Sequence, residues 1–229
     1  MDRTDLFIDV HTHKIATDNQ IAILNLIINK EFIGPPQYFQ QNTDNQKVYF
    51  SAGVHPWYMD NWQLQMERLN EIASNPNIIA IGECGLDKKV GKPIAEQIEL
   101  FHLQIALSEH LQKPLIIHCV KAFNELIEIK KNTKAKMPWI VHGFNGSIEI
   151  AMHCINSGMT LSFGKSLLNA NSNNIQIIKT LSNSSFFLET DDSNYSIEQV
   201  YTQCSTIKRI AIEQLTSDLA KNFNNSFKC

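Results

Sequence analysis

The sequence has no surplus of positive charge. Its 229 residues include 20 lysines and arginines against 23 aspartates and glutamates, and the formal net charge is -3. Proteins that hold duplex nucleic acid through many phosphates usually present a basic face. The charge balance therefore argues against extended, non-specific DNA binding, but it leaves a small anionic substrate or a single strand end possible.

The sequence also lacks a long apolar segment and a disulfide or zinc motif. Its longest apolar run, IAILNLII at 21–28, contains Asn25 and is too short to span a bilayer. The start MDRTD has no apolar signal-peptide core. The five cysteines are odd in number and form no C-x-x-C pair, which favours reduced thiols. We therefore expect a cytoplasmic protein with no membrane partner and no obligate protein partner.

What is present is an alternation of short apolar runs and helix-like segments. Hydrophobic residues make up 43% of the chain and charged residues 19%, which is ordinary for a globular protein. Short continuous apolar runs are typical of parallel strands covered on both faces. We predict strands at 6–10, 21–28, 48–53, 78–82, 114–118, 138–142, 159–163 and 186–189. We predict helices at 62–74, 94–112, 121–133, 147–157, 172–182, 196–210 and 212–225.

This order predicts a (β/α)8 TIM barrel that is trimmed or distorted, formed by a single domain over residues 1–229. The distortion is expected early in the chain. Residues 14–20 are too few for a crossover helix, and residues 34–46 read as a loop.

Side chains that can bind divalent cations stand where the predicted strands end. In a barrel this is the face on which active sites form. Imidazole nitrogens and carboxylate oxygens both suit divalent metals. The residues, in strand order, are His11, His13, Glu83, His118, His142 and Asp191.

These six residues predict a two-metal site. His11 and His13 point to the same side of a strand and could hold one ion, which Asp191 would complete. Glu83 has two carboxylate oxygens and could bridge to a second ion held by His118 and His142. The ions, for which Mg, Mn and Zn are all suitable, would lie about 3.5–4 Å apart.

Each residue also has a structural interpretation when it is taken alone. His11 and His13 could be a surface pair, His118 could be a satisfied core histidine, and Asp191 could cap a helix, although Ser196 is the better N-cap. A buried glutamate or histidine without a partner is costly, however. A metal cluster explains all of the strand ends at once, and we favour it for that reason.

The ordered blocks DVHTH, AGVHPW, AIGECGLD, PLIIHCVKAF, VHGFNGS, LETDD and LTSDLAKNFNNSF resemble the TatD-type metal-dependent hydrolases of the amidohydrolase-like barrels. The resemblance covers nearly the whole chain. It implies that His11, His13, Glu83 and Asp191 bind the first ion and that His118 and His142 bind the second. It also implies that His55 contacts the scissile phosphate, in a phosphodiesterase that acts on DNA ends.

We therefore expect a metal-bridging hydroxide as nucleophile, with Asp191, Glu83 and His55 as catalytic residues. His55, Lys121 and Lys165 would steady the developing negative charge, and Lys88 in the KKVGK loop at 88–92 would recruit phosphate. Two alternatives stay open. The same metal core could hydrolyse another phosphoester, a lactone or a cyclic amide, or the protein could be a non-catalytic metal-binding module.

Overall fold

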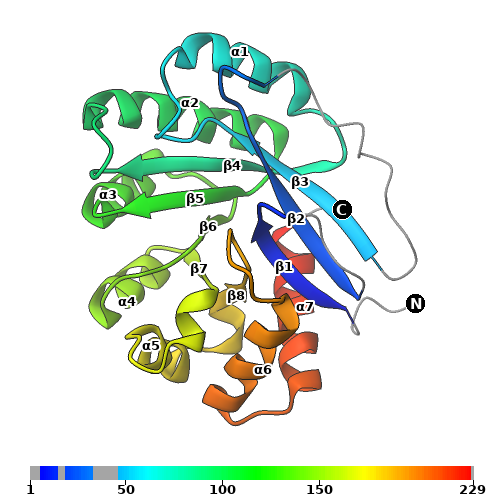
Figure 1. The fold of residues 1–229 in the computed structure, drawn as a ribbon. Helices are drawn as coiled ribbons and strands as arrows, with labels where there is room; N and C mark the ends of the chain where they lie inside the picture. The colour runs from blue at the N-terminus through cyan, green and yellow to red at the C-terminus, as the bar shows by residue number, and fades with distance from the viewer. Residues whose placement is uncertain (1–5, 15–18, 33–45, 228–229) are drawn as a thin grey trace.

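Eight parallel strands form one sheet, ordered β1 to β8 as they follow in the chain (Figure 1). The structure is a computed structural model that describes residues 6–14, 19–32 and 46–227. The predicted loop at 34–46 falls outside these residues except for Gln46, which begins β3. The strands are β1 (Phe7–Thr12), β2 (Gln20–Ile27), β3 (Gln46–Gly53), β4 (Ile78–Asp87), β5 (Leu115–Val120), β6 (Trp139–Val141), β7 (Met159–Phe163) and β8 (Phe186–Leu188).

The two edge strands meet and nearly close the sheet into a barrel. An isolated bridge joins Thr12 to Asp191 just beyond β8. The His13 amide donates to the Asp191 carbonyl at 3.2 Å, and the Asp191 amide donates to the His11 carbonyl at 2.9 Å. The predicted (β/α)8 barrel is thereby confirmed, and its closure brings the first and last polar motifs of the chain together.

Helices lie on the outside of the sheet over most of the strands (Figure 1). Those of the described residues are α1 (Trp62–Ile72), α2 (Ile94–Leu111), α3 (Phe123–Thr133), α4 (Ile148–Asn156), α5 (Asn174–Thr180), α6 (Ile197–Lys208) and α7 (Ile212–Ser226), with 3-10 turns η2 (Lys165–Leu168) and η3 (Asn183–Ser185). Within the described ranges, no helix lies between β1 and β2, as predicted for the short segment 14–20. None of these helices is long and apolar enough to cross a membrane.

The base of the barrel is apolar. Phe223 in α7 and Phe227 just after it belong to the same buried cluster as Ile8, Ile116 and Phe187 near the starts of β1, β5 and β8. Because this packing fills the amino-terminal end of the strands, the polar residues are left to the opposite end.

The predicted end of the fourth strand at residue 82 is wrong. All ten residues of β4 are buried, and the strand continues to Asp87, so Glu83 lies inside the strand. Gly82 and Gly85 allow the close approach of β4 to β5. A Cβ on Gly82 would lie 2.3 Å from the Ile116 carbonyl oxygen, and both Gly82 and Gly85 have positive φ values, 149° and 131°.

Candidate metal centre

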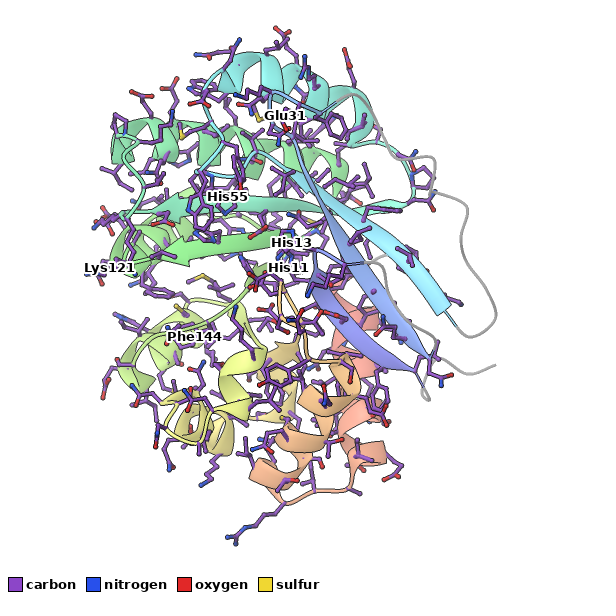
Figure 2. The ribbon with its side chains drawn as sticks, in the orientation of Figure 1. His11, His13, Glu31, His55, Lys121 and Phe144 are labelled. Carbon is purple, nitrogen blue, oxygen red and sulfur yellow. The ribbon has the colours of Figure 1, made fainter. Side chains whose placement is uncertain are left out.

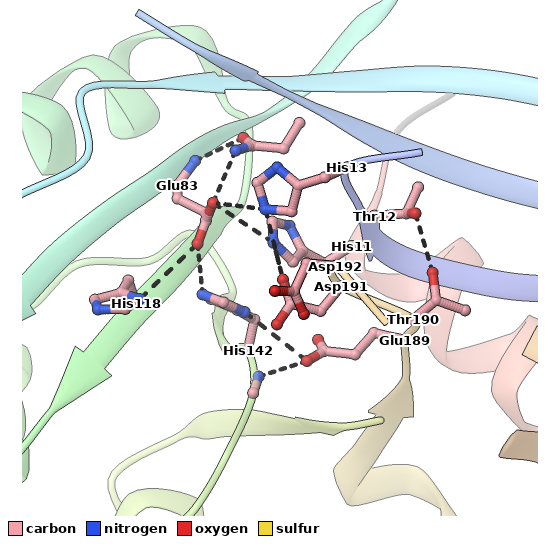
Figure 3. Close-up of polar contacts among 12 residues, drawn as sticks. His11, Thr12, His13, Glu83, His118, His142, Glu189, Thr190, Asp191 and Asp192 are labelled. Carbon is pink, nitrogen blue, oxygen red and sulfur yellow. Dashed lines mark hydrogen bonds and ion pairs between the residues drawn. The ribbon is translucent and has the colours of Figure 1, made fainter. Parts of the chain in front are cut away.

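Glu83 stands at the centre of the polar cluster, with one carboxylate oxygen facing the first strand (Figure 3). Its Oε2 atom lies 3.2 Å from His13 Nε2 and 3.6 Å from His11 Nε2. Asp191 Oδ1 lies 3.5 Å from the same His13 nitrogen and 3.7 Å from that of His11. The four residues predicted for the first ion therefore come together.

The second oxygen of Glu83 faces histidines from three other strand ends. Its Oε1 atom lies 2.7 Å from His142 Nε2, 3.7 Å from His55 Nε2 and 3.9 Å from His118 Nδ1. Since Oε1 and Oε2 face different sets of imidazoles, the carboxylate has the placement that a bridging ligand needs.

Three sets of side chains place their ligand atoms within 4.8 Å of one another and could each hold an ion. They divide the histidines differently from the predicted pairing. His142 groups with His11 and Asp191, while His118 groups with Glu83 and His55. His142, predicted for the second ion, therefore groups with two residues predicted for the first, and His55 lies as close to Glu83 Oε1 as His118 does.

The donor set fits divalent cations. Both ring nitrogens of His11 are buried without a hydrogen-bond partner, and such orphaned polar groups are costly. Burial, followed by the positive charge of His142, lowers the pKa of His11 well below its usual value. His11 is therefore neutral, with a lone pair available for a metal.

The two carboxylates of the cluster differ in their pKa values. Burial raises the pKa of Glu83, but the imidazoles of His11 and His142 beside the carboxylate, with hydrogen bonds from His13 and His142, outweigh this effect and hold the pKa well below the ordinary range. Burial, together with the negative charge of Glu189, raises the pKa of Asp191 to about 6. Glu83 is thus the permanent anion of the cluster, and Asp191 is the group that can exchange a proton near neutral pH.

Asn25 holds Glu83 in position, and the sequence interpretation did not assign it a role. Its side-chain amide donates to Glu83 Oε2 at 2.8 Å, and its carbonyl oxygen accepts the Glu83 backbone N–H at 2.9 Å. The Ser51 hydroxyl donates to the same Asn25 oxygen at 3.1 Å. The signal in the sequence was a polar residue within the apolar run 21–28.

Asp87 orients His118 in a similar way. Asp87 Oδ2 lies 2.9 Å from His118 Nε2 and accepts the indole N–H of Trp57 at 2.7 Å. With Nε2 held by this carboxylate, the other ring nitrogen of His118 faces Glu83. Such outer partners set the tautomer of a metal-binding histidine.

The lysines predicted to contact substrate lie farther out. Lys88 pairs with Glu125 at 2.5 Å, and Lys165 pairs with Asp192 at 2.8 Å. Lys121 is exposed beyond the end of β5, and Figure 2 shows it well away from His11 and His13. By contrast, His55 lines the hollow of about 270 Å³ above the cluster.

The centre has the histidines and acidic residues that a metal-dependent hydrolase needs. A comparison of the sequence with protein-family models points to the same class. The model described as TatD related DNase matches residues 10–228 of the chain. The chain belongs to the TatD-related DNase family. The predicted family is confirmed, and with it the class of metal-dependent hydrolase.

Several known proteins align with the chain. It is 28% identical over 199 residues to the Bacillus subtilis "uncharacterized metal-dependent hydrolase YabD", which covers 79% of this chain and 78% of that protein. It is 38% identical over 119 residues to a Rahnella "3'-5' ssDNA/RNA exonuclease TatD", which covers 47% of this chain. Only 45% of the Rahnella exonuclease and 58% of its Klebsiella pneumoniae counterpart are spanned by the match.

Solved structures of the TatD family share the fold. YJJV, a TatD homologue from Escherichia coli, superposes with a TM-score of 0.82 at 20% identity and covers 96% of this chain and 97% of that one. A TatD-family hydrolase from Entamoeba histolytica gives a TM-score of 0.72 at 18% identity, with coverage of 97% and 98%. At these identities the likeness concerns the barrel alone.

Proposed function

We propose that this TatD-family hydrolase is a phosphodiesterase that acts on DNA ends with two divalent cations. The observation that carries the proposal is the placement of Glu83, whose two carboxylate oxygens face separate sets of histidines. The name of the Rahnella relative, an exonuclease of single-stranded DNA and RNA, supports a nucleic acid substrate. The overall net charge of -3 is compatible with a strand end held at a local cationic site.

The residues of the chain divide the chemical work. Bound divalent cations would supply Lewis acidity, which polarises a phosphoryl oxygen and makes water a stronger acid. His11, His13, Glu83, His118, His142 and Asp191 would hold them. Asp191 would take the proton from the attacking water, because a carboxyl group with a pKa of about 6 is mostly ionised at neutral pH.

His55 is suited to contact the phosphate as a neutral donor. The backbone N–H of Trp57 donates to its Nδ1 at 3.0 Å. Burial, opposed by the charge of Glu83, lowers the pKa of His55 to about 3. A neutral ring whose Nδ1 accepts a hydrogen bond carries its proton on Nε2, so Nε2 can donate to a phosphate oxygen. Lys88 and Lys121 would make weaker contacts at the outer rim.

A hydrolysis panel on the metal-supplemented protein tests the proposal. It should contain single-stranded DNA, a generic phosphodiester, a phosphomonoester and a lactone, with Glu83→Ala beside Glu149→Ala, an exposed glutamate on α4. We expect phosphodiester cleavage by the parent protein and by Glu149→Ala, and loss of cleavage and of most bound metal in Glu83→Ala. Activity confined to the lactone would overturn the phosphodiesterase assignment. Bound metal without activity on any substrate would indicate a non-catalytic module.

A further inference from the structure

Trp57 is an exposed aromatic ring at the edge of the metal centre. Its side chain is 52% exposed, whereas Trp139 is 1% exposed and packs in the core. The Trp57 ring meets the His55 and His118 rings at steep angles, 84° and 77°, with centroids 5.1 and 5.8 Å away. The Trp57 ring therefore continues the side of the metal centre that His55 and His118 form, and it reaches toward solvent.

The orientation of the Trp57 ring is set by a buried acid. The indole N–H donates to Asp87 Oδ2 at 2.7 Å, and Asp87 is 2% exposed. The remaining Asp87 oxygen accepts the backbone N–H of Lys89 at 2.7 Å. An aromatic ring that is oriented before a ligand arrives loses little conformational entropy when a planar group stacks on it.

Trp57 lines two hollows. One lies above the metal centre, and Trp57 lines it together with His55 and Glu83. The other, of about 370 Å³, is lined by Trp57, Asp87, Lys89, Val90 and Val120. A linear substrate whose phosphate sits in the first hollow can thus place its neighbouring group in the second.

The second hollow suits a planar, mostly apolar group better than a phosphate. Two valines and an indole provide its apolar wall, and the negative charge of Asp87 opposes an anion there. The polar atoms of the Trp57 and Asp87 side chains already have partners. The Trp57 indole N–H donates to Asp87, and the Asp87 carboxylate also contacts His118 and accepts the backbone N–H of Lys89. Lys89 brings the hollow's positive charge.

We propose that Trp57, with Val90 and Val120, forms a nucleobase-stacking subsite that binds the base next to the scissile phosphate. This rests on the proposed phosphodiesterase function and names the substrate feature that the site reads. Stacking of a base on an aromatic side chain tolerates any base, since every base has a π face. The subsite therefore predicts dependence on the presence of a base without a preference for its sequence.

Binding to the metal-supplemented protein tests the subsite independently of hydrolysis. The probes are deoxyadenosine 5′-monophosphate and deoxyribose 5-phosphate, which share the phosphate and differ in the base. We expect the nucleotide to bind about 5- to 150-fold more tightly, the range that one stacked base provides. Trp57→Leu should bring this ratio close to one, and Trp57→Phe should keep most of it. Tyr195→Leu is the matched control, because Tyr195 is 47% exposed and lines a different hollow, so the ratio should not change.

Equal binding of the two probes by the parent protein would overturn the subsite, as would an unchanged ratio in Trp57→Leu. If Trp57→Leu does not fold, tryptophan fluorescence of the parent protein decides instead. The nucleotide should quench it and the sugar phosphate should not, and Trp57→Phe should lose the quenching. If the nucleotide binds more tightly than the sugar phosphate but no phosphodiester is cleaved, the subsite is supported and the proposed phosphodiesterase function is refuted. Cleavage without a base-dependent ratio would refute the subsite alone.

Discussion

Replacing Asn25 with leucine tests whether the partner of Glu83 controls the metal centre. Leucine has the same branched arrangement of side-chain heavy atoms as asparagine and suits the apolar strand β2, so the change removes the hydrogen bonds while keeping the branched shape. Asn25 and Glu83 are 8% and 4% exposed, and water cannot easily replace the lost bonds. The substitution would remove two hydrogen bonds between Asn25 and Glu83, of 2.8 and 2.9 Å.

The expected magnitude follows from those two contacts. A hydrogen bond to a charged group contributes about 1.5–3 kcal/mol, and a buried N–H left without a partner costs about 1–3 kcal/mol. We therefore expect Asn25→Leu to lower the free energy of unfolding by about 3–5 kcal/mol. Loss of an outer partner of a metal ligand typically weakens metal affinity by about 10- to 100-fold, and we expect this loss as well.

The assay is urea unfolding with a chelator present, followed by metal titration of the folded variant. Ser51→Ala, which removes only the 3.1 Å bond to Asn25, should cost about 0.5–1.5 kcal/mol. Asn174→Leu is the matched control, because Asn174 is a buried asparagine that donates to Phe144 and Ser166 instead. It should lower stability without weakening metal binding. An Asn25→Leu protein that binds metal as tightly as the parent would refute the positioning role.

Three further changes probe the acids and the metals. Asp191→Asn should lower kcat by about 10²–10⁴ with little effect on substrate binding; an unchanged kcat would exclude Asp191 as the base. Removal of the metal ions with a chelator should lower Tm by about 5–10 °C, because ions present at about 100 times their Kd stabilise the folded protein by about 2.7 kcal/mol. An unchanged Tm in a calorimetric measurement would contradict this. Asp9 has a pKa raised to about 7, chiefly by burial, so the folded state keeps a proton that the unfolded state has lost. Parent stability should decline by up to about 4 kcal/mol between about pH 4 and 7, and Asp9→Asn should remove this decline in urea unfolding; equal pH dependence in the two proteins would refute the assignment.

The periodicity of the chain was sufficient to predict the barrel. Short apolar runs that alternate with helical segments leave few ways to bury both faces of a parallel sheet. The predicted strand positions therefore agree with the structure to within a few residues for most strands. The fourth strand was the exception, because Gly82 and Gly85 have the composition of a turn but serve the close contact with β5. A pair of glycines looks the same in the sequence whether it forms a turn or allows close contact between strands. Only the position of the neighbouring strand distinguishes the two.

The candidate ligands were readable from the sequence because the fold places every strand end on one rim. Which atoms face each other was not readable. The pairing of His142 with His11, and the division of the Glu83 oxygens between two sets of histidines, depend on how the barrel closes through Thr12 and Asp191.

The sequence by itself determined the kind of chemistry: imidazole and carboxylate groups at strand ends, in an order found in TatD-type hydrolases. Tertiary structure alone decided how that chemistry is held in place. Asn25 is 58 residues from Glu83, and Asp87 is 30 and 31 residues from Trp57 and His118. No local spacing relates residues so far apart, since their contact arises only when parallel strands are laid side by side and curved into a barrel.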